Sequence, residues 1–292
     1  MGKQTALQKA LHFFVTKIII GIAVIGGLVA LVEWLGRLLL DKTQLNDNTK
    51  NVIIAISNSA IAISGYVLLF SMYEKRQIKE LRASTFGKNA VIGCVSGLLL
   101  QSLFIIVIYL AGTYSVVRVN PVSTLVVSFA FALSAGFVAE ILLLGVSFRL
   151  IEEQSGTVIA FTIFIVLFAV LHMNAKGATI VSIGATAMQA GFMLPAAYVF
   201  SRSLWLPVFL HFSWDFAEPG IFGGINPSTS ITQGLFTSKI TGAPLLTGGQ
   251  TGPQDSLQSL VLCLLTGTLF LLLAKRKNHF IKPKWQRTAT NR

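Results

Sequence analysis

Four ionisable residues stand inside strongly apolar stretches of the chain. They are Glu140 in GFVAEILLLG, His172 in FAVLHMN, and both His211 and Asp215 in LPVFLHFSWDF. An ionisable group within a membrane helix costs about 2.5 to 3.5 kcal/mol on insertion scales and usually faces the interior of the bundle. We therefore predict that these four residues form one functional site.

The residue types at this site suit acid and base chemistry. Glu140 has no basic residue within four positions to pair with, and burial brings a carboxyl group toward its neutral form, as a general acid or base requires. His211 and Asp215 are four residues apart, so the carboxylate can orient the imidazole on one helix face. The structural alternatives are a protonated core Glu140, a hydrogen-bonded His172 at a helix end, and an inert His211 and Asp215 pair.

The same residues also include possible zinc ligands. Zinc takes nitrogen and oxygen ligands and leaves a position open for water in catalytic sites, and Glu140, His172 and His211 would be those ligands. The HExxH spacing is absent. We expect no cofactor, with zinc as the alternative, because a Glu and a His can activate water while a second His and a polar partner stabilise the oxyanion.

The composition places these residues in a membrane protein. Of 292 residues, 53% are hydrophobic and 12% are charged, whereas soluble domains carry about 25% charged residues. A membrane-spanning helix needs roughly 20 apolar residues. We predict an all-α polytopic transmembrane helix bundle of about eight spans, the seventh of them short: 14–40, 52–72, 90–112, 123–151, 156–173, 177–200, 204–216 and 258–274.

The net charge of +12 comes from basic residues that flank the helices rather than from a separate basic domain. They gather before the first span, between residues 75 and 88, and in the tail from Lys275 to Arg292. This pattern predicts that both termini are cytoplasmic. We expect the tail, with Phe280 and Trp285, to anchor on anionic lipid, and we expect no nucleic-acid partner.

Two other features have structural interpretations. Glu33 precedes Arg37 by four residues, a spacing that predicts an ion pair on one helix face. Residues 217–257 are rich in Gly, Pro, Ser and Thr but also contain apolar residues, so we expect a long connection that packs partly against the bundle.

In these stretches the chain resembles the CPBP family of intramembrane proteases, the CAAX-protease and bacteriocin-processing group also called Abi. The resemblance covers roughly residues 125–262. Phe168 and His172 match the second family motif, and His211 and Asp215 match the third. The resemblance divides the chain into N-terminal helices 1–3 (1–124), a CPBP/Abi-like membrane core with helices 4–7 and a long loop (125–262), and the last helix with its basic tail (258–292).

The first family motif is incomplete. In the family it is a pair of adjacent Glu residues followed, after three residues, by Arg and usually Gly. Here Glu140 and Gly145 match, whereas Ala139 replaces the first Glu and Leu144 replaces the Arg. The first Glu is a leading candidate for the family's water-activating base, so its loss bears directly on activity.

The resemblance implies an intramembrane endopeptidase of a bacterial cytoplasmic membrane. Its substrate would be a membrane-associated or prenylated protein or peptide, as in CAAX processing or bacteriocin and peptide maturation. Glu140 would act as base with His172, while His211 and Asp215 would hold the oxyanion. The alternatives are an inactive family member that serves as a membrane scaffold or immunity protein, and a transporter with a proton relay.

The predicted spans contain one conflict with that assignment. They place Glu140 toward the inner end of the fourth span and His172 toward the outer end of the fifth. The two residues can meet only if these helices end elsewhere or tilt.

Overall fold

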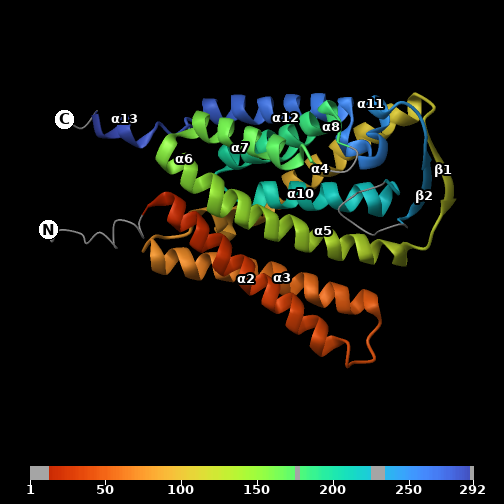
Figure 1. The fold of residues 1–292 in the computed structure, drawn as a ribbon, viewed down its shortest axis with the longest axis horizontal. Coiled ribbons are helices and arrows are strands. Elements are labelled where there is room, and N and C mark those ends of the chain that lie inside the picture. The colour runs from red at the N-terminus through yellow and green to blue at the C-terminus, as the bar shows by residue number, and fades with distance from the viewer. Residues whose placement is uncertain (1–12, 175–177, 225–233, 290–292) are drawn as a thin grey trace.

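The computed structural model describes residues 13–174, 178–224 and 234–289. Within these ranges the chain forms a bundle of helices (Figure 1). The longer helices are α2 (Phe14–Leu40), α3 (Asp47–Tyr73), α4 (Ala83–Leu110), α5 (Leu125–Glu140), α6 (Arg149–Ser155), α7 (Thr157–His172), α8 (Ile180–Met188), α9 (Leu194–Ser201), α10 (Trp205–Phe216) and α12 (Leu257–Arg276). The remaining elements are short: strands β1 (Tyr114–Val119) and β2 (Phe236–Ile240), helices α11 (Pro244–Thr247) and α13 (Lys284–Ala289), π-helices η3 (Ile141–Phe148), η4 (Gln189–Met193) and η5 (Ala217–Ile221), and the 3-10 turns η1 (Lys79–Leu81), η2 (Val122–Thr124), η6 (Gly249–Thr251) and η7 (Pro253–Asp255).

Six of the described helical segments are long and apolar enough to cross a membrane: Phe14–Leu40, Asp47–Tyr73, Ala83–Leu110, Val122–Ser155, Ile180–Ser201 and Leu257–Arg276. The predicted all-α polytopic bundle is confirmed. The other two predicted spans are shorter helices, since α7 has 16 residues and α10 has 12. At about 1.5 Å per residue they cover about 24 and 18 Å of a hydrocarbon layer about 30 Å thick.

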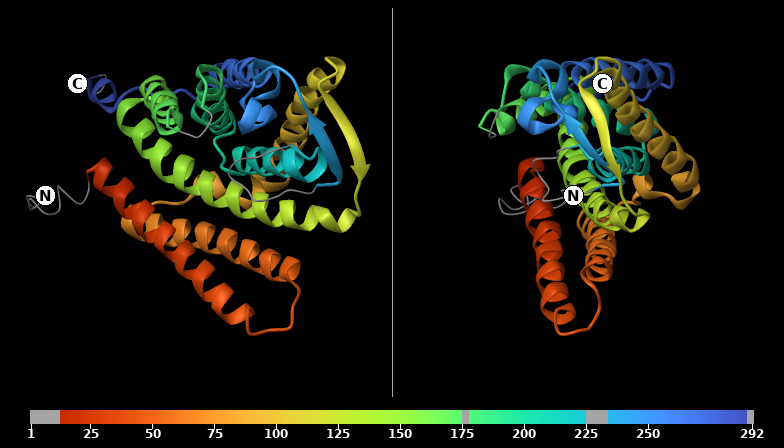
Figure 2. Two further views of the ribbon diagram at one scale, coloured as in Figure 1. Left: turned by 45° about the vertical axis from the view of Figure 1, so that its right-hand side comes forward. Right: turned by 90° about the vertical axis from the view of Figure 1, so that its right-hand side faces the viewer.

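Helix α10 occupies the middle of the bundle. It packs against α4 and α5, while α5 packs in turn against α3, and α2 and α3 form a hairpin on the outer side (Figures 1 and 2). On the opposite side, α12 packs against α8 and α9, and α7 packs against α8. The short helix that contains two of the candidate site residues is therefore enclosed by longer ones.

A close approach of α4 and α10 depends on glycine. A Cβ at Gly97 would lie 2.5 Å from the carbonyl oxygen of Leu210 and would collide with the hydroxyl of Ser213. Small residues at helix crossings let backbones approach closely in this way. These contacts bring α10 into the centre of the bundle.

Replacing this glycine should loosen the bundle. We expect Gly97→Ala to lower the free energy of unfolding by about 1 to 3 kcal/mol, as overpacked sites do, measured by thermal unfolding of the purified protein in detergent. Gly87→Ala is the matched control in the same helix, because nothing lies within 4 Å of a Cβ there. Equal stability of the two variants would contradict this account of the crossing.

The segment 217–257 packs against the bundle, as the sequence predicts, over the part that the structure describes. Strand β2 pairs antiparallel with β1, with Tyr114 opposite Ile240, and the Tyr114 hydroxyl donates a hydrogen bond to the carbonyl of Phe222 (2.9 Å). This two-stranded sheet was not predicted, because each strand is short and its partner is distant in sequence. Residues 225–233 lie outside the described ranges.

Helices α5, η3 and α6 form one long helix that ends at Gly156, whose φ of 85° only glycine adopts readily. The helix extends four residues beyond the predicted end at 151. Glu140 stands 16 residues before Gly156 and His172 stands 16 residues after it. The two residues are thus equally distant in sequence from the turn at Gly156, whereas the predicted helix end at 151 made these distances unequal.

Buried ion pairs join the helices at the end of the bundle where α2 begins and α12 ends. Glu74 accepts from Lys17 (2.8 Å), Arg76 (2.9 Å) and Arg149 (2.9 Å). Glu80 pairs with Arg76 at 2.6 Å. These contacts link α2, the segment after α3, and α6, so removing a charge should affect the whole end of the bundle.

This network predicts an acid-dependent loss of stability. Burial by itself raises the pKa of Glu74, but the charges of Arg149 and Lys17 outweigh it and hold that pKa below its ordinary value. Burial also opposes ionisation of Glu80, and hydrogen bonds from Arg76 and Tyr66 lower its pKa overall. The stability that both carboxylates contribute is fully present above the unfolded-state pKa of about 4.3 and is lost as the pH falls through the lower folded-state values.

We therefore expect the thermal unfolding temperature in detergent to fall steeply below about pH 4.3. Glu74→Gln should be less stable at pH 7 and should lose less stability on acidification than the unsubstituted protein. Parallel acid profiles for the two proteins would contradict a role for Glu74.

Candidate active site

Glu140, His211 and Asp215 lie together inside the bundle. The Nδ1 atom of His211 is 2.8 Å from Oε1 of Glu140, and its Nε2 atom is 3.4 Å from Oδ2 of Asp215. Glu140 is 1% exposed and Asp215 is 7% exposed. One imidazole thus stands between two buried carboxyl groups.

Local sequence and helix packing both contribute to this geometry. His211 and Asp215 share a face of α10 through their spacing of four residues, as predicted. Glu140 reaches them from α5, where Gly136, one turn earlier, allows the backbone of α10 to approach. A Cβ at Gly136 would lie 2.9 Å from the backbone nitrogen of Phe212.

The π-helix η3 begins immediately after Glu140. Extra residues of this kind within a helix are frequent at functional sites, because they change the direction in which side chains project. Oε1 of Glu140 bonds to His211, while its Oε2 atom is buried and has no hydrogen-bond partner among the described residues. A general base needs one carboxyl oxygen to take the proton, and this oxygen is the one that His211 does not bind.

His172 lies apart from these three residues. Its Nδ1 atom is 2.9 Å from the carbonyl oxygen of Phe168, and the two rings stack with centroids 6.3 Å apart. Helix α7 packs against α8 and η4, whereas α5 packs against α10. His172 therefore stands on a helix that packs elsewhere in the bundle than the helix of Glu140.

No group of three or more His, Cys, Asp or Glu residues that could hold a metal occurs within the described ranges. In particular, Glu140, His172 and His211 do not converge as a set of zinc ligands would. His211 instead directs both of its ring nitrogens toward carboxyl groups. This arrangement suits proton transfer better than metal binding.

A further buried carboxyl group, Glu218, was missed in the sequence. It is fully buried in η5, its Oε1 atom lies 3.4 Å from the backbone nitrogen of Gln254, and its Oε2 atom has no hydrogen-bond partner in the described part of the chain. The EPG sequence at this position suggested a loop. The helix continues past Phe216 instead, so Glu218, three residues after Asp215, remains close to the site.

Asp255 follows Gln254, whose backbone N–H donates to Glu218. Its Oδ1 atom accepts a hydrogen bond from Thr186 (3.1 Å). Burial raises the pKa of Asp255, although hydrogen bonds from Thr251 and Thr186 and the charge of His172 oppose the shift. Glu218 and Asp255 are thus two further acidic groups in the segment that follows α10.

In the structure, a core residue occupies the position of the Arg that the first motif lacks. Leu144 is 1% exposed and belongs to the hydrophobic core, where an arginine in its place would need a buried partner. The nearest arginine along the helix, Arg149, donates instead to the carbonyl of Gly145 and to acidic residues at the end of the bundle. The family's Arg therefore has no substitute at this position.

Six apolar spans around a buried cluster of two carboxyl groups and an imidazole define an integral membrane protein with a polar site inside its helix bundle. Residues 121–217 of this protein match the family model described as type II CAAX prenyl endopeptidase, Rce1-like. The predicted resemblance to the CPBP and CAAX protease family is thereby confirmed over this segment, which contains Glu140, His172, His211 and Asp215. No curated protein and no solved structure matches the chain.

Proposed function

We propose that the protein is an intramembrane endopeptidase that hydrolyses a peptide bond in a membrane-associated protein or peptide. The family match supports a peptidase of the CAAX type at a coarse level. The observation that most directly supports this proposal is the buried contact of Glu140 with His211, which lies in turn beside Asp215. Whether the substrate is prenylated or is a peptide such as a bacteriocin precursor stays open.

The role of Glu140 in this reaction follows from Oε2, its carboxyl oxygen without a hydrogen-bond partner among the described residues. Oε2 of Glu140 takes a proton from water as the water oxygen attacks the carbonyl carbon of the scissile bond. His211 directs its two ring nitrogens at Glu140 and Asp215, so it stabilises the negative charge that develops on the carbonyl oxygen as a neighbouring cation, and Asp215 orients the ring. The proton held by Glu140 then passes to the leaving nitrogen as the carbon to nitrogen bond breaks. The contact between Glu140 and His211 thus places the base beside the charge that stabilises the oxyanion.

His172 has a separate place in this proposal. It is the last residue of α7, and its Nδ1 atom is bound to the carbonyl oxygen of Phe168, which leaves Nε2 as the ring nitrogen for a ligand. We assign it to the second wall of the substrate site, where it would hydrogen bond to the peptide rather than activate water. Replacing it should therefore weaken substrate binding more than it slows the chemical step.

Incubating the purified protein with a library of membrane-anchored peptides tests the proposal. Cleavage by the unsubstituted protein, lost in Glu140→Gln, is the expected result. A chelator should leave cleavage unchanged, whereas loss on chelation and restoration by zinc would replace the metal-free mechanism. Cleavage that persists in Glu140→Gln, or no cleavage by any preparation, would overturn the proposal.

The replacements at Ala139 and Leu144 favour a second candidate function. A family member without those residues could retain the site as a binding pocket and act as a membrane scaffold or immunity protein. It would bind a membrane peptide equally well with and without Glu140→Gln and would cleave none. The peptide library distinguishes the two functions in one experiment.

A further inference from the structure

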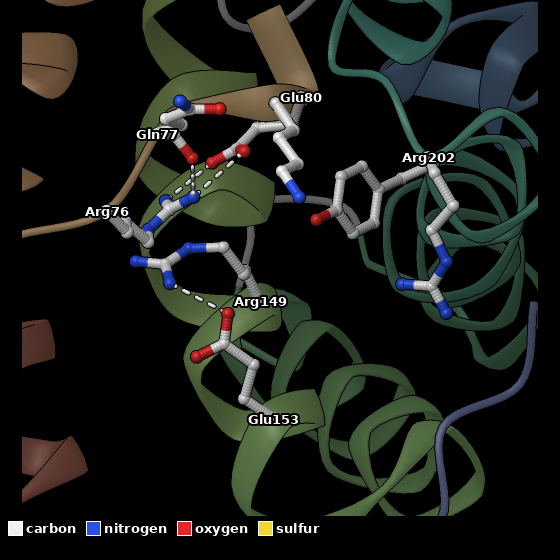
Figure 3. Close-up of a pocket in the computed structure, with 8 residues that line it drawn as sticks. Arg76, Gln77, Glu80, Arg149, Glu153 and Arg202 are labelled. Atoms are coloured by element: carbon white, nitrogen blue, oxygen red, sulfur yellow. Dashed lines mark hydrogen bonds and ion pairs between the residues drawn. The ribbon is translucent and has the colours of Figure 1, made fainter. Parts of the chain in front are cut away.

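A polar cavity lies away from the candidate active site, at the end of the bundle where α2 begins. It has a volume of about 530 Å³ and is formed by the segment after α3, by α6 and by the end of α9. Figure 3 shows Arg76 and Arg149 on one wall and Arg202 on the opposite wall. Lys79 is the fourth cationic residue that lines it.

The carboxylates near this cavity are already paired. Glu80 is held by Arg76, Glu153 by Arg149 at 2.8 Å, and Glu152 by Arg202 at 2.6 Å. Glu74 is shared by Lys17, Arg76 and Arg149. Within the described residues, five cationic side chains therefore face four carboxylates, and Lys79 is the one that makes no ion pair.

Unused hydrogen-bond donors accompany this excess charge. The Arg149 side chain is 4% exposed, and its Nη2 atom is buried without a hydrogen-bond partner among the described residues. Lys79 contributes an exposed ammonium group to the lining, and Gln77 contributes an amide. Guanidinium and ammonium groups together recognise the several oxygens of a phosphate.

The position of the cavity also favours a phosphate ligand. It lies where the spans Val122–Ser155 and Ile180–Ser201 end, and Arg202 in its lining donates to the carbonyl of His279 in the basic segment Lys275–Lys284, at the end of the bundle where a membrane protein meets lipid headgroups. We propose that this cavity is a binding site for a phosphate group, either in the headgroup of an anionic phospholipid or in a free phosphate compound. The proposal does not depend on the peptidase reaction.

The site can be tested by ligand-dependent thermal stability of the full chain in detergent, because a ligand that binds only the folded state raises the unfolding temperature. The probes are dioctanoyl phosphatidylglycerol, dioctanoyl phosphatidylcholine, and inorganic phosphate compared with chloride at equal ionic strength. The variants are Lys79→Glu and Gln77→Glu, both at exposed positions, and Lys88→Glu is the control with the same charge change outside the cavity.

We expect the phosphate-containing probe that binds to raise the unfolding temperature in a saturable way. The probe concentration that gives half of this rise should be at least about tenfold higher in Lys79→Glu and unchanged in Lys88→Glu, as loss of one charge-assisted contact implies. Gln77→Glu should also raise this half-saturating concentration. A rise with phosphatidylglycerol alone identifies a lipid headgroup, whereas a rise with inorganic phosphate as well identifies a free phosphate. No saturable rise with either, or equal weakening in Lys79→Glu and Lys88→Glu, would overturn the proposal.

Discussion

Glu140→Gln should reduce peptide cleavage by about 10²- to 10⁴-fold, the contribution typical of general acid and base catalysis. Glutamine preserves the size of the side chain and can still bond to His211 through its amide oxygen, but it cannot accept a proton from water at the free position of Oε2. The loss should therefore appear in kcat rather than in KM. Steady-state kinetics on a membrane-anchored peptide would measure it.

The control for this substitution is Glu33→Gln. Glu33 is also a glutamate of a membrane-spanning helix, but its Oε1 atom pairs with Arg37 at 2.6 Å and its Oε2 atom accepts from Asn58 of α3, away from the candidate site. Cleavage by Glu33→Gln should match that of the unsubstituted protein, and both variants should keep its unfolding temperature within a few degrees. Equal losses of activity in the two variants would indicate a structural effect and argue against catalysis by Glu140.

Arg149→Leu should lower the free energy of unfolding by about 3 to 5 kcal/mol, as removal of one partner from a buried ion pair does. Its guanidinium lies 2.9 Å from Glu74 and 2.8 Å from Glu153, and its Nε donates to the carbonyl of Gly145 at 2.9 Å. The loss of stability should be near the lower limit of this range, because Glu74 retains its ion pairs with Lys17 and Arg76. Chemical or thermal unfolding in detergent would measure the change.

Arg37→Leu provides the comparison for this second prediction. The Arg37 side chain is 57% exposed, and exposed ion pairs contribute about 0 to 1 kcal/mol. A double variant, Arg149→Leu with Glu74→Gln, should cost less than the sum of the two single variants, because the contact between these two side chains is lost only once. A cost for Arg149→Leu no larger than that for Arg37→Leu would show that the network does not hold this end of the bundle together.

These two predictions concern the same long helix. Glu140 and Arg149 are nine residues apart on the continuous segment Val122–Ser155. The ion pairs at Arg149 fix one end of this helix to α2 and to the segment after α3, while α10 packs along its middle. We expect substitutions in the network to lower stability without changing which groups perform the chemistry, so kcat and unfolding temperature should separate the two roles.

The amino-acid sequence by itself determined the features that depend on neighbouring residues. Continuous apolar runs located the helices, because the length needed to cross a membrane can be counted along the chain. Spacing of four residues predicted the pairing of Glu33 with Arg37 and of His211 with Asp215, and both contacts are present. Two matching motifs and part of a third, in order along the chain, predicted the resemblance to the family whose model matches residues 121–217.

Tertiary structure alone decided which residues from different helices meet. Glu140 contacts His211 rather than His172, because glycines at α4 and α5 admit α10 between them while α7 packs elsewhere. Glu218 joins the site because α10 continues into a π-helix instead of ending before it. Arg149 finds Glu74, 75 residues earlier in the chain. Such contacts depend on helix crossings and local irregularities, and the hydrophobic pattern of each helix is compatible with several of them.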